Sequence, residues 1–287
     1  MNQAVLDVAP APRTAAGVGA ALTFITPQDT KPVFHSSAYT GGAPRVLFET
    51  ERHTVAIHDM RPLAGALSLD REGFELLRHE TAVFDLHDDH AIEHVYYPEI
   101  EALLRAVTGA SRVVVFDATR RSDAGTGAQN RDGLRGPASR VHVDYTEKSG
   151  RQRLKDLLGE AEAARLAESG ARIVQINVWR PIRGPVCRSP LALADASSVD
   201  PKDLIATDQV FPDRVGEIYH LAYHAAQRWY YAPEMTPNEV VLIKGYDSLA
   251  DGRARFTPHG AFDLPDTPAD APPRESIEVR TLLVIEH

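Results

Sequence analysis

The chain has 287 residues, of which 43% are hydrophobic and 25% charged, so it can bury a substantial core, and disordered or fibrous classes are excluded. Its formal net charge of -9 leaves no general basic surface for a phosphate backbone, and we expect no nucleic-acid partner. The single cysteine, Cys187, excludes an intramolecular disulfide and a thiolate-rich metal site. One cysteine, and a beginning without a basic leader or a long apolar run, predict a cytoplasmic protein without a membrane partner.

The first third of the chain is predicted to be mixed in secondary structure. Residues 1–20 are rich in Ala, Pro and Gly and are expected to form a flexible arm before a single domain at 21–287. The elements predicted next are strands between Arg45 and Arg61, a helix over 70–80 capped by Asp70, a helix from Asp88 or Asp89 that ends near Tyr96-Tyr97-Pro98, and a helix over Glu99–Thr108.

The rest of the chain is predicted to be largely β. The predicted elements are a strand at 112–118, a polar glycine-rich surface loop at 120–139, a strand at 139–146, a helix over about 150–168, a strand at 171–179, a short helix at Asp200-Pro201, and strands at 216–224, 227–231, 239–247, 254–259 and 276–286. Helices that precede a run of antiparallel strands indicate a mainly β fold with flanking helices (α+β) and a jelly-roll barrel.

The most informative motif is Val141-His142-Val143-Asp144, in which two metal-ligand side chains alternate with valines. The period of two in a strand puts His142 and Asp144 on one face and the valines on the other. A second histidine from a distant strand would complete a triad of two histidines and one carboxylate, which binds iron(II) and leaves open positions. His259 is the best candidate, with His220 and His224 as substitutes; the alternative is a structural His–Asp pair.

Two arginines follow His259 on the last predicted strand. Arg274, Ser276 and Arg280 share a strand face, and a guanidinium can hold the far carboxylate of a dicarboxylate co-substrate such as 2-oxoglutarate. We favour Arg274 with Ser276 as the main anchor and Arg280 as a second contact or a structural ion pair. Arg180 and Arg228 are the alternative anchors, and an exposed polar strand face is the simpler interpretation.

Other functions remain open at this level. The segment with His90, Glu93 and His94 matches the H-x-x-E-H pattern of one class of zinc metallopeptidases. A solvent-exposed polar helix face would have the same residues. A catalytically silent jelly roll that binds a small ligand is a further alternative. Trp179, Arg180, Tyr230 and Tyr231 are expected either to line a ligand pocket or to belong to the core.

Several motifs in the same order resemble the CmcJ/NvfI-type oxidoreductases, a family that includes fungal hydroxylase/desaturases. The resemblance extends from about residue 85 to the C-terminus, and its motifs are HVDYT, INVWRPIRGPV, SPLALADASSVDPKDL, RWYYAPEMTPNEVVLIKGYDS, ARFTPHGAF and PPRESIEVR.

This resemblance implies a double-stranded β-helix (cupin-like) fold and dependence on iron(II), 2-oxoglutarate and dioxygen. It also implies hydroxylation or desaturation of a small natural-product molecule. By the matching motifs, it implies His142, Asp144 and His259 as metal ligands and Arg274 and Arg280 as candidate 2-oxoglutarate anchors. The oligomeric state does not follow from the sequence.

Overall fold

Two facing β-sheets form the body of the protein. The structure, a computed structural model, describes residues 17–125, 127–130 and 133–286. In this part of the chain the large sheet contains ten strands, in the order β1 (Val18–Ile25), β4 (Thr50–Asp59), β14 (Trp229–Tyr231), β11 (Leu191–Ala194), β16 (His259–Ala261), β9 (His142–Val143), β13 (Val215–Leu221), β12 (Leu204–Val210), β2 (Val33–His35) and β3 (Arg45–Leu47). This mainly β architecture confirms the predicted fold class.

The small sheet has five strands among the described residues. Their order is β5 (Phe74–Arg78), β15 (Glu239–Asp247), β10 (Arg172–Pro181), β17 (Glu275–Ile285) and β6 (Arg112–Ser122). All four neighbouring pairs are antiparallel. A separate hairpin follows β6 and consists of β7 (Ala128–Asn130) and β8 (Gly133–Arg135).

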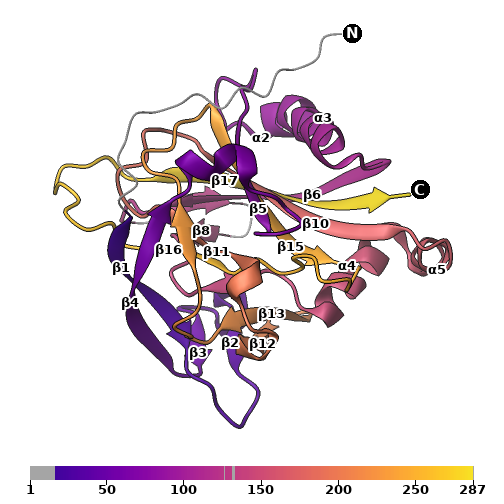
Figure 1. Cartoon of the computed structure of the whole chain (residues 1–287), viewed down its shortest axis with the longest axis horizontal. Coiled ribbons are helices and arrows are strands. Elements are labelled where there is room, and N and C mark those ends of the chain that lie inside the picture. The colour runs from indigo at the N-terminus through magenta and orange to yellow at the C-terminus, as the bar shows by residue number, and fades with distance from the viewer. Residues whose placement is uncertain (1–16, 126, 131–132, 287) are drawn as a thin grey trace.

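The helices lie at the outside of the sheets (Figure 1). They are α1 (Ser37–Thr40), α2 (Asp89–Ala91), the π-helix η2 (Ile92–Tyr96), α3 (Tyr97–Thr108), α4 (Glu147–Leu158), α5 (Glu160–Glu168) and the 3-10 helices η1 (Arg61–Ala66), η3 (Ala196–Ser198) and η4 (Pro201–Asp203). Among the described residues, no helix combines the length and the apolar character that crossing a membrane requires.

The alternation of side chains in the small sheet separates two environments. On the outer face, Val178 of β10 and Ile277 and Val279 of β17 pack with Ile100 and Leu104 of helix α3. The inner face carries polar residues toward the large sheet, and an apolar cluster fills the space beside them, with Trp179 and Ile243 from the small sheet and Leu193 from the large one. A buried polar surface therefore lies between the sheets, at the place where a site can form.

Several predicted elements differ from the structure. The helix predicted over 70–80 is wrong, because Phe74–Arg78 is strand β5, which pairs with the buried strand β15. The predicted helix end at Tyr96-Tyr97-Pro98 is also wrong: Pro98 lies in the first turn of α3, where a missing N–H costs no hydrogen bond. The predicted helix over 150–168 is broken at Gly159 into α4 and α5.

Boundaries also moved in the predicted arm, loop and last strands. Residues 1–16 of the predicted arm lie outside the described part, while Val18 already belongs to β1. The loop predicted at 120–139 contains the end of β6 and the β7–β8 hairpin. The strand predicted at 254–259 is instead β16, which begins at His259 and continues to Ala261 because its partners are β11 and β9.

Candidate metal centre

His142 and Asp144 project from the same face of one short segment. The two valines of the motif, Val141 and Val143, are completely buried, whereas the side chains of His142 and Asp144 each keep 12% of their surface exposed. This alternation is the period of two that the sequence predicts. The Nε2 atom of His142 lies 3.5 Å from the Oδ1 atom of Asp144.

His259 joins this pair through sheet pairing. Strand β16 is antiparallel to β9, and His259 is the direct partner of His142, so both rings stand on one face of the large sheet. Their ring centroids are 4.7 Å apart. One ligand atom from each of His142, Asp144 and His259 lies within 4.8 Å of the others, and this is the one such group found among the described residues.

Backbone carbonyls orient both imidazole rings. The Nδ1 atom of His142 is 2.9 Å from the carbonyl oxygen of Arg140, and the Nδ1 atom of His259 is 3.0 Å from that of Thr257. A carbonyl only accepts, so each Nδ1 carries the proton and donates it, which leaves each Nε2 lone pair for a metal. Burial lowers the pKa of His259, and the nearby His142 adds to this effect, so the neutral ligand form is favoured.

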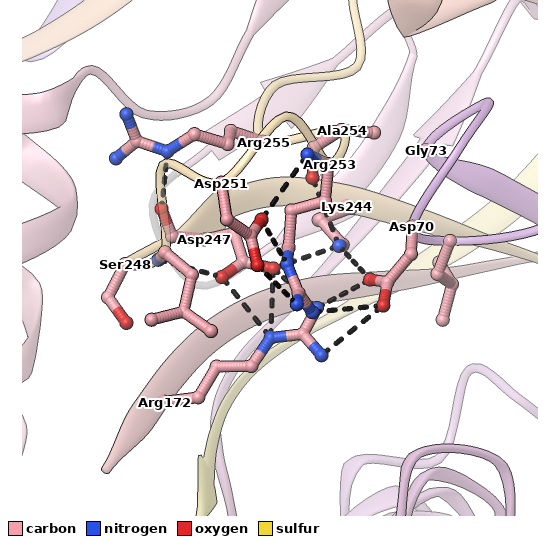
Figure 2. Close-up of polar contacts among 12 residues, drawn as sticks. Asp70, Gly73, Arg172, Lys244, Asp247, Ser248, Asp251, Arg253, Ala254 and Arg255 are labelled. Carbon is pink, nitrogen blue, oxygen red and sulfur yellow. Dashed lines mark hydrogen bonds and ion pairs between the residues drawn. The ribbon is translucent and has the colours of Figure 1, made fainter. Parts of the chain in front are cut away.

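A partly buried ion network holds the loop that leads to His259 (Figure 2). The ammonium group of Lys244 donates to Asp70 at 2.6 Å, to Asp247 at 2.9 Å and to the carbonyl oxygen of Ala254 at 3.0 Å. The backbone of Lys244 also accepts from the N–H of Thr257 at 3.0 Å. Asp70, predicted as a helix cap, is thus a member of this network, and Lys244 positions the segment whose Thr257 carbonyl orients His259.

Asp144 is held by two donors on one oxygen. The Oδ2 atom accepts from Asn177 Nδ2 at 2.6 Å and from Arg280 Nε at 3.1 Å, so Oδ1 is the oxygen that faces His142. Burial by itself raises the pKa of Asp144, but Arg280 and the two histidines outweigh it and hold the pKa well below its usual range. The carboxylate is therefore ionised, as a metal ligand must be.

Arg274 lies in a small cavity together with the two histidines. The cavity is lined by Arg121, Ala138, His142, Trp179, Leu191, His259, Ala261, Arg274 and Glu278. Arg274 is 3% exposed, donates to the Ser189 carbonyl at 2.9 Å, and has no hydrogen-bond partner for its buried Nε and Nη2 atoms. Two buried charged donors without acceptors point to a missing anion, because such groups are costly when unpaired.

Arg280 differs from Arg274 because carboxylates surround it. It donates to Asp117 at 2.6 Å and to Glu278 at 2.9 Å, in addition to Asp144. Its donors are therefore occupied by the protein itself. Ser276 is 1% exposed and lies on the same strand face as Arg274, so this face is buried rather than solvated.

The other predicted pocket residues are divided between site and core. Trp179 lines the cavity, and its ring lies 5.8 Å below the guanidinium carbon of Arg274. Arg180 points to the opposite face of β10, where it donates to Tyr96 and to the carbonyl of His79. Tyr230 and Tyr231 pack in apolar clusters, and Arg228 is bound to Asp195. Neither Arg180 nor Arg228 lines the cavity.

Among the described residues, the other candidate histidines do not form part of this centre. His220 is the direct strand partner of His142, but its Nδ1 atom is bound to the Thr207 hydroxyl at 3.0 Å. His90 and His94 stack on each other with ring centroids 4.0 Å apart, and Nδ1 of His94 is bound to the His90 carbonyl. The described residues supply no third ligand beside that pair, so the arrangement of a zinc peptidase is absent there.

Two residues in this neighbourhood were not predicted from the sequence. Asn177 is a polar residue in the middle of an apolar strand, and that exception was a usable signal. Arg121 lies in a segment that the sequence indicates as a loop, but it belongs to β6 and faces the cavity. Glycine-rich sequence after Arg121 concealed the end of the strand.

Comparison with known proteins agrees with this geometry. Residues 22–284 match a family model described as oxidoreductase/YMDC permease-like domain. The chain is 35% identical over 269 residues to the hydroxylase/desaturase efuI of Hormonema carpetanum, covering 86% of this chain and 88% of that protein. It is 33% identical over 252 residues to the Fe(II)/2-oxoglutarate-dependent dioxygenase nvfI of Aspergillus novofumigatus, covering 84% and 87%.

A solved structure supports the same relationship at the level of the fold. The iron and alpha-ketoglutarate-dependent endoperoxidase NvfI superposes with a TM-score of 0.82 at 30% identity, covering 96% of this chain and 100% of that chain. The predicted cupin-like, double-stranded β-helix architecture is confirmed by this likeness.

Proposed function

The chain belongs to the family of NvfI-type iron(II)/2-oxoglutarate-dependent hydroxylase/desaturases, and on this basis we propose that it oxidises a small natural-product molecule with His142, Asp144 and His259 as iron ligands. It is an oxygenase that uses iron(II), 2-oxoglutarate and dioxygen. The observation that carries the proposed site is the cluster of two Nε2 atoms and an ionised carboxylate, with an incompletely bonded guanidinium in the cavity that both histidines line.

The donor set fits iron(II). Two imidazoles and one carboxylate are the ligands of non-haem iron oxygenases, and they leave positions on the metal for other molecules. The three donors lie close enough to share one ion. Asn177 and Arg280 occupy Oδ2 of Asp144, so we propose Arg280 as a residue that positions this ligand rather than as a co-substrate anchor.

The chemistry of the cavity lining also suits 2-oxoglutarate. We assign the far carboxylate to Arg274, whose Nε and Nη2 atoms have no acceptor, with Ser276 beside it on the strand. A guanidinium holds a carboxylate through two parallel hydrogen bonds, and the shielding by Trp179 strengthens such a contact. When bound, iron and 2-oxoglutarate supply the oxidising power with dioxygen, while the protein orients both and excludes water.

The substrate class follows from the relatives. Their names describe hydroxylase/desaturases and dioxygenases, and NvfI is described as an endoperoxidase. We propose that this chain hydroxylates or desaturates a small molecule, with neither nucleic acid nor membrane as a partner. We also place the enzyme in the cytoplasm, which suits a chain with one cysteine, Cys187.

Anaerobic titration tests this function directly. Addition of iron(II) and then 2-oxoglutarate to the metal-free protein should produce a weak visible charge-transfer band. We expect Arg274→Gln to retain iron(II) affinity but to weaken 2-oxoglutarate binding by about a hundredfold, the size of a lost desolvated ion pair. A wild-type protein that binds iron(II) but gives no band with 2-oxoglutarate would refute the function.

A further inference from the structure

Arg121 is a second guanidinium on the wall of the iron cavity. It lies on β6 directly opposite Ser276 of β17, so it shares a sheet face with Arg274 and Glu278. It lines the cavity together with Arg274, His142 and His259. We propose that Arg121 is a second 2-oxoglutarate-binding residue, which with Arg274 makes the cavity selective for a dianionic 2-oxo acid.

The hydrogen bonds of Arg121 leave most of its donors unused. Its Nη1 atom donates to the carbonyl oxygen of Gly136 at 2.9 Å, and among the described residues no carboxylate forms an ion pair with it. The preceding residue, Arg120, is by contrast neutralised by a carboxylate. It donates to Asp89 at 2.7 Å and to the Leu86 carbonyl at 2.8 Å. Arg121 is thus held in place without being neutralised.

The surrounding carboxylates compensate Arg121 and Arg274 only in part. Glu278 acts on both guanidinium groups but already accepts from Arg280 at 2.9 Å, and Asp123, which acts on Arg274, already accepts from Arg188 at 2.8 Å. Burial lowers the pKa of Arg274 to about 10, and Arg121 contributes to that shift, as two nearby like charges must. Burial lowers the pKa of Arg121 as well. Arg274 is buried and Arg121 is partly buried, so the two neighbouring cations repel each other until an anion enters.

The two ends of 2-oxoglutarate meet different sources of positive charge. A divalent metal held by the triad would neutralise the keto-acid end, since the triad supplies only one negative charge, that of Asp144. The far carboxylate has no metal beside it, and the guanidinium groups of Arg274 and Arg121 are the cations that remain. A 2-oxo acid without that carboxylate leaves both cations unpaired, and this difference is the source of the selectivity.

A structural role is the competing explanation, because Arg121 bonds to Gly136 after the β7–β8 hairpin. The two roles predict opposite effects on the metal-free protein. Loss of a structural clamp lowers the melting temperature, whereas loss of one of two repelling cations leaves it unchanged or raises it. The inference rests on the proposed use of 2-oxoglutarate, so the test must separate the two claims.

The test measures dissociation constants for 2-oxoglutarate and for 2-oxopentanoate, which lacks the far carboxylate, by anaerobic titration of the iron(II) protein. The variants are Arg121→Gln and Arg121→Lys, with Arg120→Gln as the matched control. We expect Arg121→Gln to weaken 2-oxoglutarate binding about tenfold or more and 2-oxopentanoate binding less than about twofold. Arg121→Lys should recover part of the loss, and Arg120→Gln should match the wild type.

Each outcome bears on a different claim. Unchanged 2-oxoglutarate affinity in Arg121→Gln, with a normal wild-type band, overturns this inference and leaves the proposed function intact. Equal weakening of both oxo acids overturns the selectivity for a dianion. A lower melting temperature of metal-free Arg121→Gln, together with weaker iron(II) binding, shows a structural clamp and also overturns the inference. No band in the wild type removes the proposed function itself.

Discussion

The side chains of the proposed metal centre are oriented by different hydrogen bonds. His142 and His259 have their Nδ1 atoms bound to backbone carbonyls, and Asp144 has one oxygen bound by Asn177 and Arg280. These hydrogen bonds leave one ligand atom per residue directed at a common point. Because each proposed ligand would supply one of three protein bonds to the metal, we expect that no single loss can be replaced by a neighbour.

We therefore predict that His142→Ala, Asp144→Ala and His259→Ala each abolish iron-dependent turnover and lower iron(II) affinity by about a hundredfold or more. Anaerobic iron(II) titration measures the affinity, and circular dichroism checks that each variant is folded. The exposed His224 provides a control, since His224→Ala should keep both affinity and turnover. Full activity in His259→Ala would contradict the triad.

His220 carries a separate prediction about pH. Burial, with smaller effects from His142 and Arg140, lowers its pKa to about 3, far below the value in an unfolded chain. Between about pH 6.5 and pH 3 the unfolded state therefore binds a proton that the folded state does not bind. Stability contributed by neutral His220 is complete above that window and is lost as the pH falls, by about 1.4 kcal/mol per unit.

Urea unfolding of the chelator-treated protein between about pH 7 and pH 5 measures this slope. His220→Gln should show a shallower loss of stability on acidification than the wild type, because the titrating group is gone. His224→Gln serves as the control, since that side chain is exposed and should leave the slope unchanged. Identical slopes in wild type and His220→Gln would contradict the assignment.

At the scale of the elements, pairing decides what alternation alone leaves open. Strand β17 packs Ile277 and Val279 against helix α3, and the alternation of side chains therefore turns Ser276 and Glu278 inward. Arg274, just before the strand, lines the cavity on the same side. The turn before β5 matters in the same way. The carbonyl of Gly73 accepts from the Thr257 hydroxyl at 2.9 Å and from the Lys244 N–H at 2.8 Å, next to the network of Figure 2.

Gly73 is predicted to be required by this close approach. It has a φ of +86°, and a Cβ atom there would lie 2.2 Å from the Thr257 Oγ1 atom. Gly73→Ala should displace Thr257, whose carbonyl orients His259, and so weaken iron(II) binding as well as stability. Gly109 has a φ of +70° with nothing within 4 Å of a Cβ, so Gly109→Ala isolates the backbone strain.

Urea unfolding and iron(II) titration compare the two glycine variants. We expect Gly73→Ala to lose about 2 kcal/mol more stability than Gly109→Ala, a typical effect of forced overpacking. Iron(II) affinity should fall in Gly73→Ala and stay at the wild-type value in Gly109→Ala. Equal stability and equal affinity in the two variants would show that Thr257 moves aside without cost.

At the scale of the whole molecule, the proposed metal centre lies where the two sheets meet. The triad stands on the large sheet, while Asn177, Arg280 and Arg274 come from the small sheet, and the cavity lies between them. Ligands bound at this boundary make contacts that exist only when the sheets are packed together. Binding must therefore stabilise the fold as a whole.

We predict that iron(II) with 2-oxoglutarate raises the free energy of unfolding by about 2.7 kcal/mol when the ligand is at a hundred times its dissociation constant. Anaerobic thermal unfolding with and without the ligands measures the effect, and a chelator should reverse it. His259→Ala is the control that should show almost no ligand-dependent shift. A wild-type melting temperature that is insensitive to both ligands would exclude a site between the sheets.

The sequence by itself determined the local features that depend on neighbours in the chain. The period of two places His142 with Asp144 and Arg274 with Ser276, and strand Glu239–Asp247 has the predicted bounds because its apolar run has no rival structure. The predicted helix over 70–80 failed, because pairing of Phe74–Arg78 with β15 outweighs local propensity.

Only the tertiary structure decided which of the matching residues act together. His259, rather than His220 or His224, meets Asp144 because β16 pairs with β9 in a register that local sequence does not encode. The sequence alone does not distinguish Arg274 from Arg280. In the structure, carboxylates from other strands bind Arg280, whereas the Nε and Nη2 atoms of Arg274 have no acceptor. Distant strands supply those neighbours, so the electrostatic difference arises only when the sheets pack.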